Sequence, residues 1–530
     1  MSLASAPLRD VPTSVLIDRL SGGWHESHSG LLQEFVQRWE AILDNNVEVS
    51  EITNDSLRFV TDLSHLYLRA THKTPCLMLG GNADVPRMIG EFFRKIPPRH
   101  GVPIILPLSD RNLELTRTSA PKGRCLVIPL MDLKQMTKEE PYKVLRALFL
   151  EQIPRRRLNP YNLLLPAEGS LFVGRENELG RLFDEENTSF AIAGPGRIGK
   201  TSLMNGYKQL LIRAGDSRMA RCLAVDFYDC DDFTADGVAR FFAMEIGATI
   251  RSWQISASKL VKFMKYQYQR LGGPPELLLD EVDMVCSSDA FKFLGAAARA
   301  GLCRLIMCGK GDLLKTMLRS KSPLECRLEL IQLQPLQERY AFELLLQPLS
   351  DLGFDIVNKE NFASRVLQFT GRLPHLIQLC GEKLVEYGIQ QQTGTLTEID
   401  LDRVEADFET EQYFTNPLED LNDPITRLIG LSVIKHQDTR QFSAISVQAM
   451  MARIGVYVDL KRAKEICNDL VINNILAWSN GAYCVANKGL SFYFKRGGNL
   501  ENAINKATRD AKIVSRNGNN AGNTALPSKP

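Results

Sequence analysis

The sequence has no long apolar run and little net charge. No stretch approaches the ~18 consecutive apolar residues that span a bilayer, and residues 1–10 lack the charged-then-apolar plan of a signal peptide. The formal net charge of +2 gives no argument for a nucleic-acid partner held by the overall field of the protein, so any such contact must be local. We expect a cytoplasmic protein with no membrane partner, and its 530 residues predict three or four domains.

Paired cysteines, metal-ligand sets and catalytic triads are also missing. The eleven cysteines are odd in number and contain no C-x-x-C pair, which is typical of small core residues in a reducing compartment. His25 and His28 stand without a Cys or acidic cluster beside them, so we do not expect a metal site there. Residues 1–150 contain no triad and no nuclease pattern, which leaves the role of this region open.

What the chain does contain is a phosphate-binding loop. The pattern G-x-x-x-x-G-K-[ST] follows directly on the apolar run 190–193. In such a loop, backbone N–H groups turn toward the phosphates, and the next helix presents its N-terminus to the same anion. Lys200 is expected to neutralise the β- and γ-phosphates and Thr201 to hold Mg²⁺. The nucleotide-binding residues predicted here are Gly194, Pro195, Gly196, Arg197, Ile198, Gly199, Lys200, Thr201 and Ser202.

A second motif argues against a chance match. Residues 277–283 read Leu-Leu-Leu-Asp-Glu-Val-Asp, an apolar run ending in acids about 80 residues downstream of the loop. A parallel-sheet nucleotidase places its second key strand at this distance. Asp280 is expected to orient the Mg²⁺ shell and Glu281 to polarise the attacking water. Taken alone, the run also fits a buried strand capped by solvated acids, but the two motifs together predict that ATP or GTP binds.

The N-terminal part reads as an α/β domain followed by a linker. Apolar spacing predicts helices over 31–43, 57–68 and 85–96 and strands over 76–79, 102–106 and 125–130, which form a domain over 1–150 of unknown role. The loop at 80–84 is interpreted as a tight turn. Residues 151–168 are rich in proline and arginine and predict a linker. Its arginine run 155–157 is interpreted as a solvated face, with a contact to nucleic acid or phosphate as the alternative.

The remaining chain predicts four further regions. Strands at 222–227, 277–279 and 304–307, separated by amphipathic helices, indicate a parallel sheet covered on both faces, within a nucleotidase core at 169–335. A helical lid follows at 336–415. The segment 420–496 contains three helices, whose starts include Asp423-Pro424, Ser443 and Asp459, and a hairpin around Asn480-Gly481. This order suggests a winged helix, and the Asn- and Gly-rich tail at 497–530 is predicted to be disordered.

Residues ~170 to 490 resemble the STAND branch of P-loop ATPases, close to archaeal-type ATPases within the AAA+ group. Phe172-Val173-Gly174-Arg175-Glu176 looks like the entry motif of that family, which implies that Gly174 and Arg175 lie near the adenine. Thr370 to Leu376 resembles its Gly-x-x-Pro element, which implies that Pro374 lies against the base. The implied fold class is α/β, with an AAA+-like core, a lid, a winged helix and a separate N-terminal domain. The implied cofactors are ATP and Mg²⁺.

The sequence departs from this family in two places and follows it in a third. Where many relatives carry a polar residue that senses the γ-phosphate, this chain has Lys310 within Met307-Cys308-Gly309-Lys310. Arg327 stands where relatives often carry a catalytic arginine that reaches a neighbouring subunit, although a solvated strand residue is an equal alternative. The helical repeat array that commonly serves as a sensor is missing from the sequence, which leaves the trigger open.

The resemblance implies a nucleotide-driven switch in which ATP and Mg²⁺ bridge the core and the lid, the winged helix moves with them, and hydrolysis at Glu281 resets the system. In relatives such switches form homo-oligomers or control an effector protein, often in bacterial signalling or antiviral defence. A scaffold that binds nucleotide without hydrolysing it is a further alternative.

The rival function is that of a DNA-binding initiator or loader, because the chain also resembles origin-recognition ATPases that pair an AAA+ core with a winged helix. Basic residues lie near the third helix of that domain and near its hairpin. Asp459, Glu465 and Asp469 interrupt them, which favours a hinge with a solvated face over a DNA surface. The basic residues concerned are Lys461, Arg462, Lys464, Lys488, Lys495 and Arg496.

Overall fold

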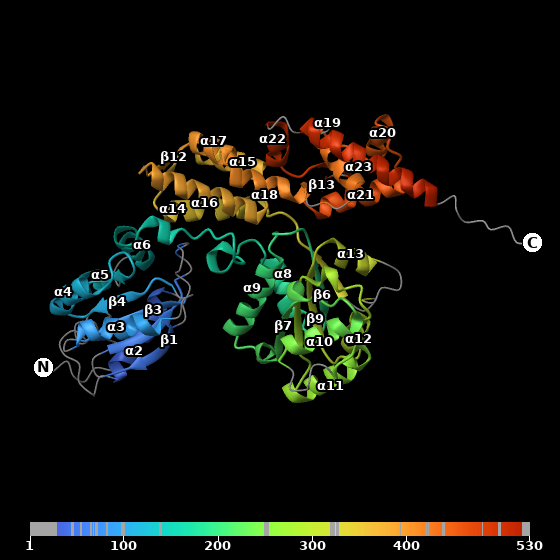
Figure 1. Cartoon of the computed structure of the whole chain (residues 1–530). Helices are drawn as coiled ribbons and strands as arrows, with labels where there is room; N and C mark the ends of the chain where they lie inside the picture. The colour runs from blue at the N-terminus through green and yellow to red at the C-terminus, as the bar shows by residue number, and fades with distance from the viewer. Residues whose placement is uncertain are drawn as a thin grey trace, which may run out of the picture.

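The structure is a computed structural model. It describes residues 29–43, 47–53, 56–63, 66, 68, 73–80, 83–96, 101–136, 140–247, 254–318, 324, 328–392, 394–419, 421, 423–436, 440–479, 481–496 and 500–521. The N-terminal domain and the core at 169–335 lie side by side, and the helical lid and the C-terminal domain extend above them (Figure 1). No helix within these ranges is both long and apolar enough to cross a membrane. The ten cysteines described are free thiols, and eight of them are buried.

The N-terminal domain is built on a five-stranded mixed sheet of order β1-β2-β3-β4-β5. The first three strands pair antiparallel and the last three parallel. The strands are β1 (Val47–Ile52), β2 (Ser56–Thr61), β3 (Thr74–Leu79), β4 (Ile104–Pro107) and β5 (Leu126–Val127). The helices are α2 (Ser29–Leu43), α3 (Val85–Lys95), α4 (Asp110–Ser119), α5 (Leu130–Gln135) and α6 (Pro141–Gln152).

The helix predicted over 57–68 is wrong, because β2 occupies its first part. Leu57 and Phe59 are buried and Arg58 between them is also buried, so the strand is covered on both faces. A run of this kind shows no period of two, and its apolar residues can equally be placed on a helix. Pairing with β1 and β3, rather than local pattern, therefore determines this element.

The core is a five-stranded parallel sheet of order β10-β6-β9-β8-β7. Its strands are β6 (Ser189–Ala193), β7 (Cys222–Asp226), β8 (Glu276–Asp280), β9 (Arg304–Gly309) and β10 (Leu328–Gln332). Its helices are α8 (Glu176–Asp184), α9 (Lys200–Arg213), α10 (Ala235–Glu245), α11 (Leu260–Leu271), α12 (Asp289–Arg299) and α13 (Gly311–Leu318). Because the strands are parallel, the loops after β6 and β8 leave the same end of the sheet, with β9 between the two strands. This arrangement confirms the predicted α/β class with a P-loop parallel sheet.

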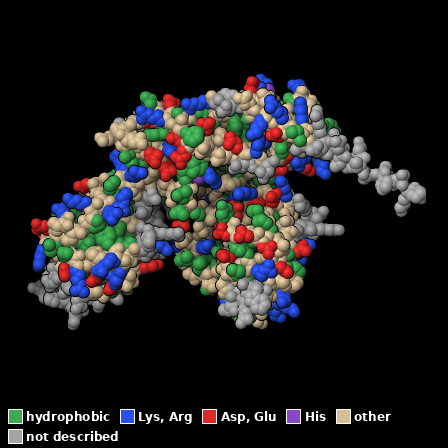
Figure 2. All heavy atoms as spheres, viewed as in Figure 1, with side chains coloured by type: hydrophobic (Ala, Val, Ile, Leu, Met, Phe, Trp, Pro, Cys, Tyr) green, Lys and Arg blue, Asp and Glu red, His purple; other side chains and the backbone are tan. Residues whose placement is uncertain are grey.

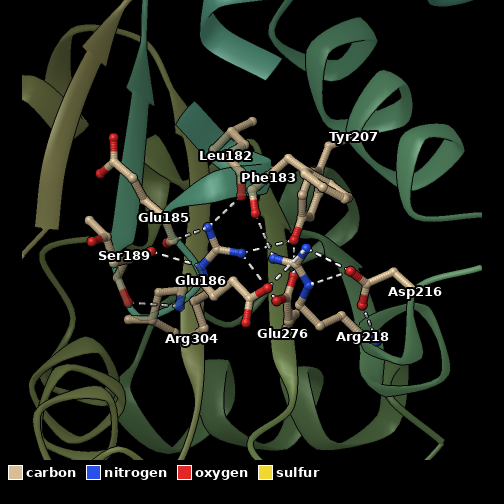
Figure 3. Close-up of polar contacts among 12 residues, drawn as sticks. Leu182, Phe183, Glu185, Glu186, Ser189, Tyr207, Asp216, Arg218, Glu276 and Arg304 are labelled. Carbon is tan, nitrogen blue, oxygen red and sulfur yellow. Dashed lines mark hydrogen bonds and ion pairs between the residues drawn. The ribbon is translucent and has the colours of Figure 1, made fainter. Parts of the chain in front are cut away.

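A buried polar network closes the opposite edge of the core (Figure 3). Arg304, at the start of β9, forms an ion pair of 3.1 Å with Glu276 at the start of β8, and both side chains are about 5% exposed. Arg304 also donates to the carbonyl oxygens of Thr188, Leu182 and Glu185 at 2.8, 2.6 and 3.1 Å. Tyr207 donates to Glu276 and accepts from Arg304 at 2.8 Å. The network therefore ties two central strands to α8 and α9.

The helical lid contains five helices and a two-stranded sheet. The helices are α14 (Glu338–Asp351), α15 (Lys359–Thr370), α16 (Pro374–Gln390), α17 (Glu398–Ala406) and α18 (Phe408–Glu419), and the strands are β11 (Asp355–Ile356) and β12 (Thr395–Leu396). The N-terminal domain contacts this lid through Arg146 of α6, whose guanidinium lies 2.8 Å from the carboxylate of Asp351 at the end of α14.

The segment predicted as a linker is packed against the lid. It contains α7 (Arg155–Leu158), and the guanidinium of Arg155 lies 4.9 Å from the ring centroid of Phe354. Tyr161 is 1% exposed and donates to the carbonyl of Leu345 at 2.7 Å. Its ring passes directly over Gly381 of α16, where an added Cβ would lie only 2.3 Å away. One aromatic side chain therefore anchors the segment on the lid, whereas Arg156 and Arg157 are exposed, as predicted for the arginine run.

The C-terminal domain has the predicted three helices and hairpin. They are α19 (Pro424–His436), α20 (Ala444–Arg453), α21 (Leu460–Ile472), β13 (Leu476–Ser479) and β14 (Ala482–Val485). Ser443 and Asp459 are the N-caps of α20 and α21, each accepting a backbone N–H of the first turn. Gly481 has a φ of 81°, as the tight turn requires.

Two further helices follow the hairpin, α22 (Lys488–Arg496) and α23 (Leu500–Ala521). The prediction of disorder from 497 onward is therefore wrong for 500–521. Leu500, Ala507 and Ala511 are buried in the core of this domain, and Glu501 pairs with Lys435 of α19 at 2.8 Å. The small alanines form a narrow stripe at helical spacing, which the surrounding Asn, Lys and Gly residues obscure in the sequence.

The buried ion pair gives a stability prediction. Glu276→Gln keeps the shape of the side chain but leaves the charge of Arg304 buried without its counter-ion, a change that costs about 3 kcal/mol or more in buried pairs. Its control is Glu329→Gln, which breaks the 2.6 Å pair with Arg181 at the surface and should cost less than about 1 kcal/mol. Calorimetric unfolding of both variants measures the difference. Equal losses would contradict the structural role of the network.

Candidate nucleotide-binding site

The loop after β6 wraps around the Lys200 ammonium. Gly199 caps α9 with a φ of 102°, a conformation in which a side chain would be strained. Lys200 is 6% exposed, and its Nζ donates to the carbonyls of Gly194 and Pro195 at 3.1 and 2.9 Å. Burial lowers the pKa of Lys200, while the nearby Glu281 carboxylate opposes this shift. The loop therefore holds a cation beside backbone N–H groups at a helix N-terminus, which suits a phosphate.

Thr201 and Asp280 meet across the sheet edge. The Thr201 hydroxyl donates to Asp280 Oδ2 at 2.6 Å, and Asp280 Oδ1 accepts the backbone N–H of Glu281 at 2.9 Å. Burial raises the pKa of Asp280. Within the described ranges, no group of three His, Cys, Asp or Glu side chains could hold a metal by itself. One hydroxyl and one carboxylate nevertheless fit Mg²⁺, which keeps several waters and completes its shell with phosphate oxygens.

Glu281 lies beside this pair in a left-handed backbone conformation, with a φ of 48°. Its carboxylate is 3.5 Å from the Nζ of Lys310, which follows β9. The stem of Lys310 approaches the phosphate loop, because a Cβ added to Gly196 would lie 3.9 Å from Lys310 Cε. Lys310 thus stands between the loop and Glu281, at the place where the sequence suggested a γ-phosphate sensor.

Asp283 fixes the position of Lys310. Its carboxylate accepts the backbone N–H groups of Lys310, Asp312 and Leu313 at 2.5, 3.1 and 3.1 Å, and so caps the start of α13. The sequence placed Asp283 in the acidic motif without a role. Three orphan N–H groups at the beginning of a helix explain why an acid is needed here.

The predicted entry motif contacts the phosphate loop through Arg175. Arg175 is 5% exposed and donates to the carbonyls of Gln334 and Ile198 at 2.9 and 3.3 Å. Burial lowers the pKa of Arg175, although Glu178, 3.3 Å away, opposes the shift. Gly174 has a φ of 71° and lies under the ring of Tyr340. Arg175 therefore links the loop to the end of β10, in addition to lining the cavity described next.

A single cavity of about 280 Å³ joins these groups to the lid. Its polar wall comes from the core and contains Lys200, Thr201 and Glu281. Its apolar wall comes mainly from the entry motif and the lid, and contains Leu171, Phe172, Val173, Leu336, Leu344 and Pro374. A cavity with one cationic, phosphate-suited end and one apolar end has the distribution that a nucleotide requires.

The connecting segment 162–167 completes this cavity, a role that the linker interpretation missed. Ala167 donates its backbone N–H to the hydroxyl of Ser202 on α9 at 2.9 Å. Leu164 is 90% exposed although it lies at the cavity. The available signal was the run Leu163-Leu164-Leu165, which is unusual for a solvated linker.

Arg197 joins the phosphate loop to the lid. It adopts a φ of 63°, and its Nη1 lies 3.1 Å from Nε2 of His375 on α16. The same guanidinium lies 4.8 Å from the ring centroid of Tyr413 on α18. Burial and the charge of Arg197 lower the pKa of His375 to about 4. The sequence assigned Arg197 to the loop but gave no reason to expect its contact with the lid.

The remaining predicted residues are distributed as follows. Arg327 lies outside the described residues. Arg462 pairs with Asp423 at 3.1 Å and with Glu465 at 3.6 Å, whereas Lys461 and Lys464 are exposed. Lys488 and Arg496 bond to the lid, through Gln368 at 2.5 Å and the carbonyl of Glu405 at 3.2 Å. On the face shown in Figure 2, basic side chains of the C-terminal domain are scattered among acidic ones.

Comparison with known proteins gives similarity of fold alone. No protein-family model and no curated protein matches the sequence. A Walker-type ATPase of Pyrococcus abyssi is 14% identical over 63% of this chain and 99% of its own, with a TM-score of 0.48. The ORC2 protein of Aeropyrum pernix, in ADPNP-ADP complexes, is 15% identical over 64% of this chain and 95% of its own, with a TM-score of 0.45. The ORC1 protein of the same organism, in complex with DNA, is 15% identical over 68% of this chain and 97% of its own, with a TM-score of 0.37.

The contact at His375 gives a pH prediction. His375 is neutral against Arg197 until the pH falls to about 4, whereas a released histidine binds a proton near pH 6.5. The contribution of this contact to the free energy of unfolding is therefore fully present above pH 6.5. It decreases as the pH drops from 6.5 toward 4, by at most about 1.4 kcal/mol per pH unit. His375→Gln should flatten the dependence of the thermal midpoint on pH in this range. Parallel curves for both proteins would contradict this role.

Proposed function

We propose that this chain is a Mg²⁺-dependent ATPase whose nucleotide pocket controls the position of the lid. The observation that carries the proposal is the 2.6 Å contact between Thr201 and Asp280 beneath the phosphate loop, with Glu281 as the next residue. It brings the loop and the acids, far apart in the sequence, into one site. Lys200 supports phosphate binding from the same loop.

Each group has a distinct role in this proposal. Lys200 leaves the carbonyls of its own loop to contact the β- and γ-phosphates, and Glu281 orients the water that attacks the γ-phosphorus. When bound, Mg²⁺ supplies charge neutralisation of the phosphate oxygens, and Thr201 and Asp280 are the residues that would hold it. Lys310 holds the Glu281 carboxylate and lies close enough to the loop to exchange that partner for a phosphate oxygen.

The lining of the cavity supports coupling between nucleotide and domain position. Core, lid and connecting segment each contribute to one cavity, so a nucleotide contacts all three. A ligand shifts a conformational equilibrium only by its difference in affinity between the two states, and contacts that form only when the lid is closed supply that difference. Tyr161 and the Arg146–Asp351 pair attach the connector and the N-terminal domain to the lid.

The C-terminal domain is attached to the lid as well. Lys488 and Arg496 of α22 bond to lid residues. It also contacts the core, because Lys315 of α13 pairs with Asp469 of α21 at 2.8 Å. The start of α13 is capped by the carboxylate of Asp283, and Asp283 lies two residues after Glu281 in the chain. A change at Glu281 therefore has a short covalent and packed route to α21.

We propose that movement of the lid and the C-terminal domain serves a signalling switch of the STAND type, whose partner is a second copy of the chain or an effector protein. Its support is the packing of basic residues of the C-terminal domain against the lid, which favours a hinge over a nucleic-acid surface. The N-terminal domain, held on the lid, would be exposed or hidden as the lid moves.

DNA binding by the C-terminal domain is the second candidate, favoured by the exposure of Lys461 and Lys464 at the start of α21. The face of α21 that carries Arg462, Glu465 and Asp469 lines a cleft toward the core. DNA would therefore meet the exposed side of α21, away from that cleft.

Variants of the phosphate site test the ATPase proposal. Lys200→Ala should abolish ATP binding, because it removes the cation of the loop. Glu281→Gln should bind ATP normally and lose hydrolysis about 10²-fold or more, because the water is no longer oriented by a carboxylate. Calorimetric binding and phosphate release measure the two properties. Hydrolysis that survives in Glu281→Gln would contradict the assigned role.

A salt titration distinguishes the two outputs. If DNA is bound, affinity should fall steeply with salt, and the Lys461→Ala/Lys464→Ala variant should weaken it and reduce the salt slope by about 2. Lys506→Ala, on the exposed side of α23, is the control. ATP-dependent growth in mass by light scattering without DNA, together with no measurable DNA binding, would favour the signalling switch.

A further inference from the structure

A second cavity adjoins the nucleotide cavity at the contact between the phosphate loop and the lid. Arg197 and His375 line both cavities. The second one, which we call the junction cavity, has a volume of about 340 Å³ and lies where the core, the lid and the C-terminal domain meet. Its lining includes Gly196 and Lys310 of the core, Leu376 and Phe414 of the lid, and Ile475 and Leu490 of the C-terminal domain.

The described lining of the junction cavity contains two cations and no carboxylate. Arg197 lies against His375 and Tyr413, neither of which carries a negative charge. Lys310 has a carboxylate neighbour in Glu281, at 3.5 Å, but Glu281 lines the nucleotide cavity instead. A cleft whose walls carry charge of one sign concentrates ions of the opposite sign. The junction cavity is therefore suited to a small anion.

Four asparagines add hydrogen-bonding groups to this cavity. Asn474, the second residue after α21, has a left-handed backbone with a φ of 57°. It lines the cavity, and its side-chain amide forms no hydrogen bond within the described part of the chain. Amide N–H groups and cations both donate to phosphate oxygens. The other three asparagines are Asn416, Asn473 and Asn487.

Lys310 lies at the boundary between the two cavities. Its side chain lines the junction cavity, while its Nζ contacts Glu281 of the nucleotide cavity. Cleavage of ATP in the proposed reaction leaves an inorganic phosphate beside Glu281, with ADP between this phosphate and the apolar wall of the nucleotide cavity. ADP therefore blocks the path back through that cavity, whereas Lys310 offers the phosphate a cation on the side of the junction cavity.

The junction cavity opens to solvent beside α18. Asn416 and Pro417 of this helix line the cavity and are exposed, whereas Ile475 and Leu490 are buried. A phosphate in the junction cavity can therefore reach the surface without displacing ADP.

We propose that the junction cavity binds the inorganic phosphate cleaved from ATP and is the route by which this phosphate leaves while ADP is still bound. The inference rests on the proposed function, because it requires ATP to be cleaved at the phosphate loop. It adds a second anion site to that function. Because the C-terminal domain forms one wall of the site, release of phosphate depends on the position of that domain.

The equilibrium test titrates inorganic phosphate into the full chain saturated with ADP and Mg²⁺ and measures binding by calorimetry. Asn474→Asp places a carboxylate in the junction cavity at nearly unchanged size, and aspartate also tolerates a left-handed backbone. Asn505→Asp, at an exposed position of α23, is the control with the same change in net charge. The wild-type protein and the control should bind phosphate equally, and Asn474→Asp should bind it about 10-fold or more weakly, because like charges repel.

The kinetic test follows a single turnover of ATP by the full chain. Asn416→Trp should narrow the exposed end of the cavity, and Gln412→Trp, at an exposed position of α18 outside the lining, is the control. Quenched-flow experiments measure cleavage, and a fluorescent phosphate sensor measures release. Asn416→Trp should leave cleavage unchanged and slow phosphate release about 10-fold, which corresponds to about 1.4 kcal/mol on the barrier. In the wild-type protein, phosphate should leave before ADP.

Four outcomes would overturn the inference while leaving the ATPase proposal intact, provided that the wild-type protein cleaves ATP and Lys200→Ala does not. They are absence of phosphate binding to the wild-type ADP complex, equal phosphate binding by Asn474→Asp and its control, release of ADP before phosphate, and equal phosphate release by Asn416→Trp and its control. The first and third need no variant, so they decide the question even if thermal midpoints show that a variant does not fold. If the wild-type protein does not cleave ATP, the proposed function fails and this inference fails with it.

Discussion

The hydrogen bond between Thr201 and Asp280 is the constraint on which the site depends. It spans from the helix after β6 to the end of β8, two strands that have β9 between them. Both residues can meet only if all three strands are in register and end at the same edge. The Arg304–Glu276 pair at the opposite edge fixes the starts of β8 and β9 and so contributes to that register. One polar pair at each end of the sheet thus supports a single geometry.

The structure connects this edge to the lid and to the C-terminal domain. Asp283 caps α13, and α13 contacts α21, so the acidic motif is linked to the C-terminal domain. Arg197 links the phosphate loop to His375 and Tyr413 of the lid. These contacts all leave from the phosphate loop motif or from the acidic motif. In the function proposed above, a local change at the γ-phosphate would move whole domains, because packed elements shift between discrete arrangements.

Features fixed by neighbouring residues could be predicted from the sequence, and features fixed by distant contacts could not. The phosphate loop and the acidic motif are contiguous patterns, and Ser443 and Asp459 cap helices through bonds within one turn. The helix expected over 57–68 is a strand because β1 and β3 pair with it. The linker and the tail were assigned to solvent because the burial of Tyr161 and Ala511 depends on partners far along the chain. The role of Arg197 in the lid contact likewise depends on how α16 lies over the core.

The most direct test of nucleotide-controlled domain movement is the distance between the core and the C-terminal domain in solution. Spin labels attached through unnatural amino acids at Lys292 of α12 and Lys506 of α23, both exposed, report it without using the native cysteines. In the Glu281→Gln background, ATP should shift the distance distribution, and additional Lys200→Ala should abolish the shift. An unchanged distribution under conditions where calorimetry shows ATP to be bound would contradict the coupling of the pocket to the domains.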